Sequence, residues 1–328
     1  MVHAPARIAL LGTYPTLVER LDGLSRPGTA LWVKRDDRTG TLYGGNKVRK
    51  LERLLPEART RGATRLVTVG AVGSHHVLAT AIWGGHQGFA VEAVLVPQPA
   101  TEHARANLRA GLAAGLRPFP VRSVAGVPFA LLERLRGGDA FHVPAGGSSV
   151  SGAMGYLDAA RELAAQVRAG EMPEPDVLVV ALGSGGTAAG LAAGLAIEGL
   201  RTRVVAVAVW APVWALAART RWLAGNCLAR AAARRSLRLE IERGYLGRGY
   251  GYPSLEGERA SAIAARVGLA LDATYTAKAF AAALDLVDAG SVRTVLYWHT
   301  LSSVDLSALV AKSPATVDGR VARLWLSA

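Results

Sequence analysis

The sequence contains little cysteine, few aromatic residues and no signal-like N-terminus. Its 328 residues include one cysteine, Cys227, so an intramolecular disulfide framework is excluded and a reducing cytosol is expected. Hydrophobic residues make up 51% and charged residues 19% of the chain, which predicts a globular protein long enough to divide into two lobes. Residues 1–12 have no cationic region followed by a long apolar run, so no signal peptide is predicted.

Uninterrupted apolar stretches of membrane-spanning length are also lacking. Residues 177–197 ("VLVVALGSGGTAAGLAAGLAI") are broken by glycines, and residues 204–218 ("VVAVAVWAPVWALAA") are broken by Pro212. Buried strand–helix units produce the same composition. No membrane partner is therefore expected.

Acidic residues are fewer than basic ones, which gives a formal charge of +13 and raises nucleic acid as a partner. The arginines are scattered, and no stretch alternates basic with aromatic residues. The densest run, residues 229–243 ("ARAAARRSLRLEIER"), has arginines at helical spacing and is interpreted as a solvated helix face. No nucleic-acid partner is predicted.

Short β-rich runs alternate with alanine-rich helical stretches along most of the chain. Strands are expected at 30–36, 64–70, 90–97, 176–183, 203–209 and 293–300, and helices at 46–62, 74–88, 101–115, 155–170, 186–197, 258–268 and 277–290. This alternation predicts an α/β fold with parallel-rich sheets flanked by helices. The chain is divided into a large domain, 1–46 and 158–328, and a small domain, 47–157.

Residues 182–190 ("LGSGGTAAG") follow a predicted strand and open a helix. Glycines allow the backbone to approach a ligand, and the free N–H groups at a helix start favour an anion such as phosphate. The loop is not a Walker motif, and Leu182 stands where a serine-hydrolase elbow has its first glycine. The alternative is a tight strand–helix turn whose glycines serve packing.

Residues 73–80 ("GSHHVLAT") also stand at a strand–helix junction. Ser74 is either a helix N-cap or a hydroxyl of the site. The histidines His75, His76, His86 and His103 lack the spacing and the companion ligands of a metal site. No metal is predicted.

Lysine is the other scarce residue, because only five of the 38 basic residues are lysines. Two of them, Lys47 and Lys50, lie in "LYGGNKVRKLE" at the start of a predicted helix. Lysine, unlike arginine, loses its proton when desolvated and binds an aldehyde covalently. A phosphate loop combined with such a lysine suggests pyridoxal phosphate. The alternative is a surface lysine on a basic helix.

Seven stretches together resemble one family. They are "VKRDD…GGNKVRKLE", "GAVGSHHV", "VPAGGSSVSGAMGY", "GSGGTAAGL", "GYGYPSLEG", "ATYTAKAF" and "LYWHT". These stretches occur in the order, and near the spacing, of the D-cysteine desulfhydrase and 1-aminocyclopropane-1-carboxylate deaminase family. The resemblance extends over about residues 10–305. The resemblance implies a two-lobed fold-type II pyridoxal phosphate enzyme, related to the tryptophan synthase β subunit. Members of the family are commonly homodimers, and the single cysteine fits a cytoplasmic location.

The resemblance also implies roles for individual residues. Lys47 matches the lysine that binds the cofactor covalently, and Lys50 matches a second lysine of the same helix turn. Asn46 matches a contact to the ring hydroxyl of the cofactor, and His75 stands where the family has asparagine. The remaining matches are the phosphate loop (Gly183, Ser184, Gly185, Gly186 and Thr187), a serine near the substrate (Ser74) and two tyrosines on the substrate side (Tyr250 and Tyr275).

Two threonines make the sequence resemble the desulfhydrases. Thr276 stands where deaminases have glutamate, and Thr300 matches a hydroxyl near the pyridine nitrogen. The chain departs from the family at Leu301 and Ser302, where two glycines are usual, and at "VLAT", where an arginine and a glutamine are usual at positions 78 and 79. These departures predict a rebuilt substrate pocket.

The predicted function is that of a pyridoxal-phosphate-dependent lyase. It would remove the α-proton of a small amino acid and eliminate the β-substituent, as a desulfhydrase-like ammonia-lyase does. The alternatives are a β-replacement synthase and a non-catalytic homologue that binds the cofactor. The sequence alone leaves the amino acid and its chirality open.

Overall fold

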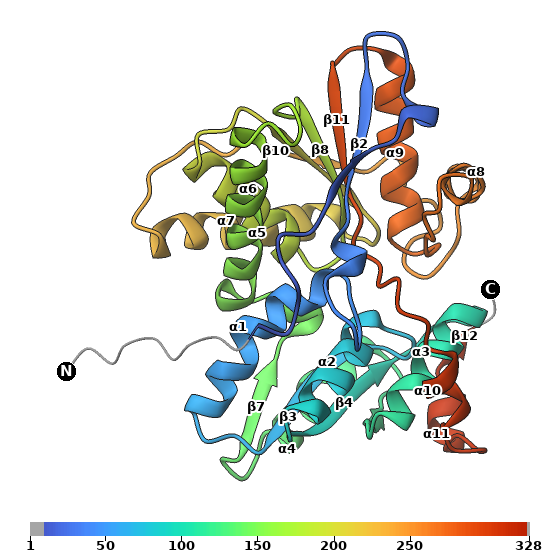
Figure 1. Cartoon of the computed structure of the whole chain (residues 1–328). Coiled ribbons are helices and arrows are strands. Elements are labelled where there is room, and N and C mark those ends of the chain that lie inside the picture. The colour runs from blue at the N-terminus through green and yellow to red at the C-terminus, as the bar shows by residue number, and fades with distance from the viewer. Residues whose placement is uncertain (1–9, 327–328) are drawn as a thin grey trace. The chain divides into compact units, whose positions relative to one another are not determined.

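The computed structural model describes residues 10–326, which pack as two units (Figure 1). Unit 2 comprises Tyr14–Asn46 and Ser148–Val304. Unit 1 comprises Lys47–Gly147 with the described terminal segments 10–13 and 305–326. The domain boundaries given above remain a prediction. No signal peptide is predicted in residues 1–12, and residues 1–9 of this stretch lie outside the described residues.

Unit 2 is built on a six-stranded sheet in the order β1-β2-β11-β8-β9-β10. Its strands are β1 (Val18–Arg20), β2 (Ala30–Lys34), β8 (Val177–Leu182), β9 (Arg203–Ala208), β10 (Leu239–Glu242) and β11 (Thr294–Trp298). Only β1 runs antiparallel to its neighbour, and the other pairs are parallel. The carboxyl ends of the five parallel strands therefore lie along one edge of the sheet.

Helices cover both faces of this sheet (Figure 1). One face carries α5 (Val150–Arg168), α6 (Gly186–Ile197) and α7 (Val213–Arg230), and the other carries α8 (Leu255–Ala265) and α9 (Thr276–Ala289). Successive residues of β8 point to opposite faces, so Leu178 and Val180 pack in one core while Val177 and Val179 pack in the other. The continuous apolar run of this strand follows from burial on both sides.

A buried carboxylate fixes the sheet edge that faces α5. Asp36, just beyond β2, accepts hydrogen bonds from Tyr156 Oη of α5 (2.6 Å) and from Trp298 Nε1 of β11 (2.7 Å). Thr16 Oγ1 donates to the same carboxylate at 3.1 Å. Because a buried carboxylate without partners is costly, these bonds hold the end of β11 in one position. The residues that follow β11 are thereby placed.

Unit 1 contains a four-stranded parallel sheet in the order β6-β4-β3-β7. The strands are β3 (Arg65–Ala71), β4 (Ala90–Val96), β6 (Arg117–Pro120) and β7 (Ala140–Val143). The helices are α1 (Asn46–Thr60), α2 (His75–His86), α3 (Glu102–Ala113), α4 (Val127–Arg134), α10 (Ser307–Ala311) and α11 (Gly319–Ala322). The short strands β5 (Gln98–Pro99) and β12 (Trp325–Leu326) pair in parallel.

The predicted α/β class with parallel-rich sheets is confirmed. Thr101 caps α3 as an N-cap should, because its hydroxyl accepts the N–H of Ala104 at 3.1 Å. None of the helices in the described part of the chain is long and apolar enough to span a membrane.

The interpretation of residues 229–243 as a helix face is wrong. Helix α7 ends at Arg230, and Ala232 adopts a left-handed conformation with φ of 51°. The chain then continues as the edge strand β10, which pairs with β9. Alternate residues Leu239 and Ile241 pack against the core beside α5, α6 and α7, so a period of two overrides the helical spacing of the arginines.

Candidate functional site

The loop between β8 and α6 lies at the carboxyl edge of the unit 2 sheet. Gly185 is the N-cap of α6 and has φ of +94°, a conformation that L-residues rarely adopt. A Cβ on Gly185 would lie 2.7 Å from Thr220 Oγ1, and a Cβ on Gly186 would lie 2.6 Å from Ser148 Oγ. Both glycines are thus required by the turn itself, while the start of α6 presents backbone N–H groups suited to an anion.

Hydroxyl and amide groups gather at this loop. Ser148 Oγ lies 2.7 Å from Ser184 Oγ and accepts the N–H of Gly186 at 3.0 Å. Asn46 Nδ2 donates to Thr187 Oγ1 at 3.2 Å. Together they form a polar cradle around the helix start, and the sequence interpretation had found Asn46, Ser184, Gly186 and Thr187 but not Ser148.

Helix α7 and the loop before it contribute three more residues that the sequence interpretation missed. Arg219 donates to the carbonyl of Ser148 at 2.9 Å, which places a positive charge beside the cradle. Thr220 packs against Gly185, and Trp210, just before α7, donates from Nε1 to the carbonyl of Gly183 at 2.6 Å. The stretch 143–156, rich in glycine and serine, was a signal for Ser148, whereas the sequence carried no signal for the others.

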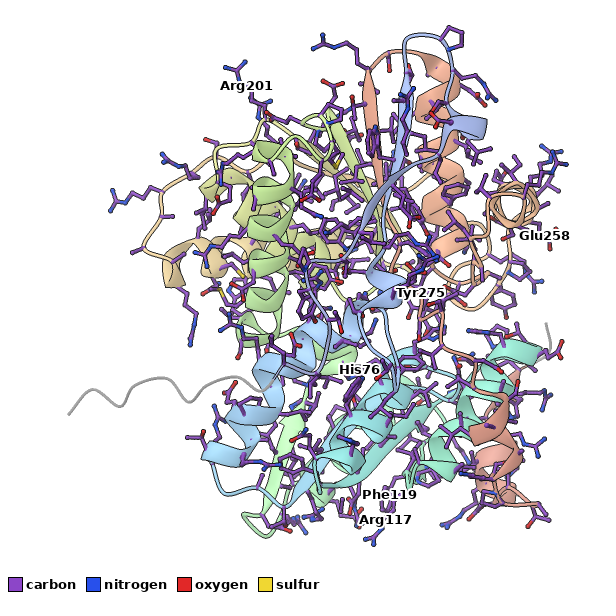
Figure 2. All side chains as sticks on the ribbon, viewed as in Figure 1. His76, Arg117, Phe119, Arg201, Glu258 and Tyr275 are labelled. Carbon is purple, nitrogen blue, oxygen red and sulfur yellow. The ribbon has the colours of Figure 1, made fainter. Side chains whose placement is uncertain are left out.

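Two tyrosines stand beside the loop. The ring of Tyr275 lies against Gly183, where a Cβ would come within 2.8 Å of its Cε1, and Figure 2 shows Tyr275 at the start of α9. Tyr275 Oη donates to Tyr250 Oη at 2.9 Å, and the rings meet edge to face at 5.6 Å. Burial raises the pKa of Tyr250 to about 12 and, with the neighbouring phenol, raises that of Tyr275. Both phenols are neutral near pH 7.

Thr276 is held by Asp272. Its hydroxyl donates to Asp272 Oδ2 at 2.7 Å and accepts the backbone N–H of Asp272 at 2.7 Å. The same carboxylate accepts the N–H groups of Thr274 and Tyr275. These bonds close the turn that begins α9, and they fix the backbone of Tyr275. Thr276 therefore supports the site residue that precedes it.

The segment after β11 passes the start of α1. Thr300 is buried, and its carbonyl accepts the N–H of Asn46 at 3.1 Å. Its neighbour His299 is buried, with Nδ1 at 3.2 Å from Tyr297 Oη. Burial lowers the pKa of His299 to about 4, so its imidazole is neutral at pH 7. Thr300 thus follows a neutral imidazole and contacts the backbone of Asn46.

Leu301 and Ser302, where the resembling family has two glycines, have different environments. Leu301 is buried, with 8% of its surface exposed. Ser302 Oγ accepts the N–H of Gly44 at 2.8 Å and that of Val304 at 3.2 Å. A Cβ on Gly45 would lie 2.5 Å from the Thr300 carbonyl, so the two backbones are in close contact. Ser302 thus stabilises the loop before α1, a role that the sequence did not reveal.

The candidate residues of unit 1 begin with Lys47, which follows Asn46 directly and lies in the first turn of α1. Lys50 is buried and donates from Nζ to the carbonyl of Gly146 at 3.0 Å. His76 is buried as well, and its Nε2 lies 2.8 Å from Thr68 Oγ1. Burial and the positive charges of Lys47 and Lys50 lower the pKa of His76, which keeps it neutral.

Ser74 and His75 stand at the start of α2. Ser74 is the N-cap, since its Oγ accepts the N–H of His76 at 3.2 Å. His75 Nε2 lies 2.9 Å from His103 Nε2, and Asn107 Nδ2 lies 3.4 Å from His75 Nδ1. Among the described residues no group of three or more histidine, cysteine, aspartate or glutamate side chains is arranged to hold a metal ion.

The comparison with protein families identifies the family of the chain. Residues 9–298 match the model described as "Pyridoxal-phosphate dependent enzyme". The chain belongs to this family of pyridoxal phosphate enzymes. The cofactor and the enzyme class predicted from the sequence are thereby confirmed.

Individual relatives agree with the resemblance seen in the sequence. The chain is 36% identical over 322 residues to "Nocardicin C-9' epimerase" of Nocardia uniformis subsp. tsuyamanensis, covering 94% of this chain and 96% of that protein. It is 35% identical over 291 residues to "D-cysteine desulfhydrase" of Salmonella paratyphi A, covering 85% and 88%. The crystal structure of an "ACC deaminase homologue" superposes with a TM-score of 0.80 at 30% identity, covering 93% and 96%. The fold-type II architecture is confirmed.

The donor groups of unit 2 fit the cofactor phosphate. The cradle combines the start of α6, the hydroxyls of Ser184, Thr187 and Ser148, and the nearby guanidinium of Arg219. A dianionic phosphate binds well to such N–H and hydroxyl donors at a helix start. The roles assigned to individual residues remain predictions, and they are developed below as a proposal.

Proposed function

We propose that the protein is a pyridoxal phosphate lyase of the desulfhydrase type, which removes the α-proton of a small amino acid and eliminates its β-substituent. Removal of HX from the amino acid, followed by hydrolysis, leaves a 2-oxo acid and ammonia. The proposal is supported by the 35% identity to the Salmonella protein named D-cysteine desulfhydrase and by Thr276 and Thr300 in place of carboxylates.

The contacts of unit 2 support our assignment of the residues that would hold the cofactor. The 183–187 loop and Ser148 would bind the phosphate, and Thr300 would donate its hydroxyl to the ring nitrogen. Lys47 would bind the aldehyde, because Asn46, its neighbour in the chain, is hydrogen-bonded to both Thr187 and Thr300. When bound, the cofactor supplies an electron-withdrawing ring that acidifies the α-hydrogen. A hydroxyl partner is a weaker one than a carboxylate, yet it suffices for α-proton loss.

The observation that carries the elimination step is the contact between the two tyrosines. Their phenol oxygens lie 2.9 Å apart, so the hydroxyl of Tyr250 is held in position by Tyr275. Its raised pKa keeps Tyr250 protonated near pH 7. We assign Lys47 as the base that accepts the α-proton and Tyr250 as the acid that protonates the leaving β-substituent. Tyr275 orients Tyr250, and Asp272 fixes the backbone of Tyr275.

The test is release of 2-oxo acid by purified holoenzyme from a panel of D- and L-amino acids that carry β-substituents. We expect Tyr250→Phe to lower kcat by roughly 10²-fold on substrates with a poor leaving group, since proton transfer contributes about that much. The loss should be smaller with a good leaving group, which needs no proton. An equal loss of kcat with both kinds of leaving group would show that Tyr250 is not the acid.

A second reaction, epimerisation at the α-carbon, is favoured by the relative named an epimerase, which matches nearly the whole chain. It shares the first step, because a base must remove the α-proton. It then returns a proton to the opposite face and releases no 2-oxo acid. Epimerisation is supported if the amino acid incorporates deuterium from deuterium oxide at the α-carbon with inversion and if no ammonia is released.

The remaining alternatives are β-replacement and loss of activity. A replacement enzyme would release a 2-oxo acid only slowly and would form a new amino acid when a thiol is added. A non-catalytic homologue would bind the cofactor without any spectral response to amino acids. We expect poor turnover of D-cysteine itself, because buried Leu301 fills volume that glycine would leave open.

We also propose that the protein works in the cytosol as a homodimer and requires neither a membrane nor nucleic acid. The single cysteine, which is buried and reduced, supports a cytosolic location. The dimer rests on the family resemblance and is tested by light scattering of the holoenzyme.

A further inference from the structure

Trp210 stands at the carboxyl edge of the unit 2 sheet, between β9 and α7. Its Nε1 donates to the carbonyl of Gly183 at 2.6 Å, so the indole is tied to the first residue of the phosphate loop. Nevertheless 43% of its surface is exposed. A large apolar side chain that is anchored at its polar atom, yet uncovered, has a fixed position and a free face.

The anchoring residue Gly183 connects Trp210 to the tyrosine pair. The ring of Tyr275 lies against the α-carbon of Gly183, and the indole of Trp210 holds its carbonyl. Tyr275 is in turn bonded to Tyr250. Trp210 and Tyr275 therefore contact the same residue, Gly183, and Tyr275 contacts Tyr250; we call these three side chains the aromatic row below. Only Trp210, at its outer end, is classed as exposed.

We propose that Trp210 is a specificity-determining residue that binds the distal part of the substrate side chain. This inference rests on the proposed function, in which Tyr250 reaches the β-substituent. A side chain that extends past Tyr250 along the aromatic row meets the indole of Trp210. The favoured substrates are amino acids whose side chain ends in an aromatic or other flat apolar group, because such a group stacks on an indole.

The side chain of alanine or serine is too short to extend along the row. Trp210 should consequently discriminate between substrates by the length and aromaticity of their side chains. It should contribute little to the binding of short substrates. Because the indole also holds the Gly183 carbonyl, its removal has a second possible effect on the phosphate loop. Trp210→Phe separates the two effects, since phenylalanine keeps a stacking ring but cannot donate the hydrogen bond.

The test measures exchange of the α-hydrogen for deuterium in deuterium oxide, which requires only the first step of the reaction. Holoenzyme is given each enantiomer of alanine and of phenylalanine in separate reactions. We expect faster exchange of phenylalanine by the unaltered protein. Trp210→Ala should lower kcat/KM for phenylalanine through KM by about tenfold more than it lowers kcat/KM for alanine. Trp210→Phe should retain most of the preference.

Trp222 provides the matched control, because it is a tryptophan of α7 that is 61% exposed and has no hydrogen bond to the loop. Trp222→Ala should leave both substrates unchanged. If Trp210→Ala impairs alanine and phenylalanine equally, Trp210 only supports the loop and the inference is overturned. If it impairs neither, the inference is overturned too. Absence of exchange with every amino acid, β-substituted ones included, would instead contradict the proposed function.

Discussion

Alanine in place of Gly185 tests the phosphate cradle, and the structure supplies a matched control at the other end of α6. Gly185 and Gly199 flank this helix, with φ of +94° and +77°. A Cβ on Gly185 would lie 2.7 Å from Thr220 Oγ1, whereas a Cβ on Gly199 would have no heavy atom within 4 Å. The two substitutions share the left-handed strain and differ in the contact.

The strain alone should lower the free energy of unfolding by about 1–2 kcal/mol in both variants. At Gly185 the hydroxyl of Thr220 must also move, and that hydroxyl donates to the carbonyl of Leu216 at 2.7 Å. Weakening this bond adds about 1 kcal/mol. We therefore expect Gly185→Ala to lower the stability of the apoenzyme by about 2–3 kcal/mol and Gly199→Ala by about 1–2 kcal/mol.

Affinity for pyridoxal phosphate separates a cradle from ordinary packing. Charge-assisted hydrogen bonds from a loop to a phosphate are worth about 1.5–3 kcal/mol each, so displacing one N–H should raise the Kd about tenfold or more in Gly185→Ala. Urea unfolding of the apoenzyme and an absorbance titration with the cofactor provide the two measurements. Equal Kd values for the two variants would show that the loop does not bind the phosphate.

The remaining predictions concern four single residues. Ser148→Ala removes the acceptor of the buried Gly186 N–H, so it should lower the free energy of unfolding by about 1–3 kcal/mol and weaken cofactor binding, as urea unfolding and titration will show. His299 has its pKa lowered from 6.5 to about 4 by burial, so the stability present above pH 6.5 should be lost as the pH falls toward 4. At about 1.4 kcal/mol per pH unit the loss reaches about 3 kcal/mol, and His299→Gln should reduce that slope in urea unfolding series. Leu301→Gly should raise turnover of D-cysteine, whereas Ser302→Gly should lower stability by about 1 kcal/mol because Gly44 N–H loses its acceptor. An unchanged D-cysteine rate in Leu301→Gly would contradict the idea that this side chain restricts the pocket.

The sequence predicted the architecture well because each strand and helix carries its own periodicity. The apolar runs at 177–182 and 203–209 are buried on both faces of a parallel sheet, as their composition indicates. Prediction failed at residues 229–243, where strand pairing with β9 determines the structure and the arginine spacing does not.

The sequence predicts site residues where a motif marks them, as at Gly183–Thr187 and Lys47, and their roles stay predictions. The residues that the sequence missed contribute through distant contacts: Ser148 reaches Gly186, Arg219 reaches Ser148, and Trp210 reaches Gly183. A short segment cannot encode which distant residue will lie beside it. Ser302 shows the same limit, because its departure from the family pattern indicated a pocket change while its hydroxyl binds Gly44.

Borohydride reduction of the holoenzyme tests the central proposal most directly. Reduction fixes a cofactor that is bound through an imine to its lysine, and proteolysis followed by mass spectrometry identifies the modified peptide. We predict that the cofactor is attached to Lys47, that Lys47→Ala abolishes this attachment, and that the variant keeps the fold. Attachment to Lys50 or to any other lysine would contradict the assignment of Lys47 as the residue that binds the aldehyde and accepts the α-proton.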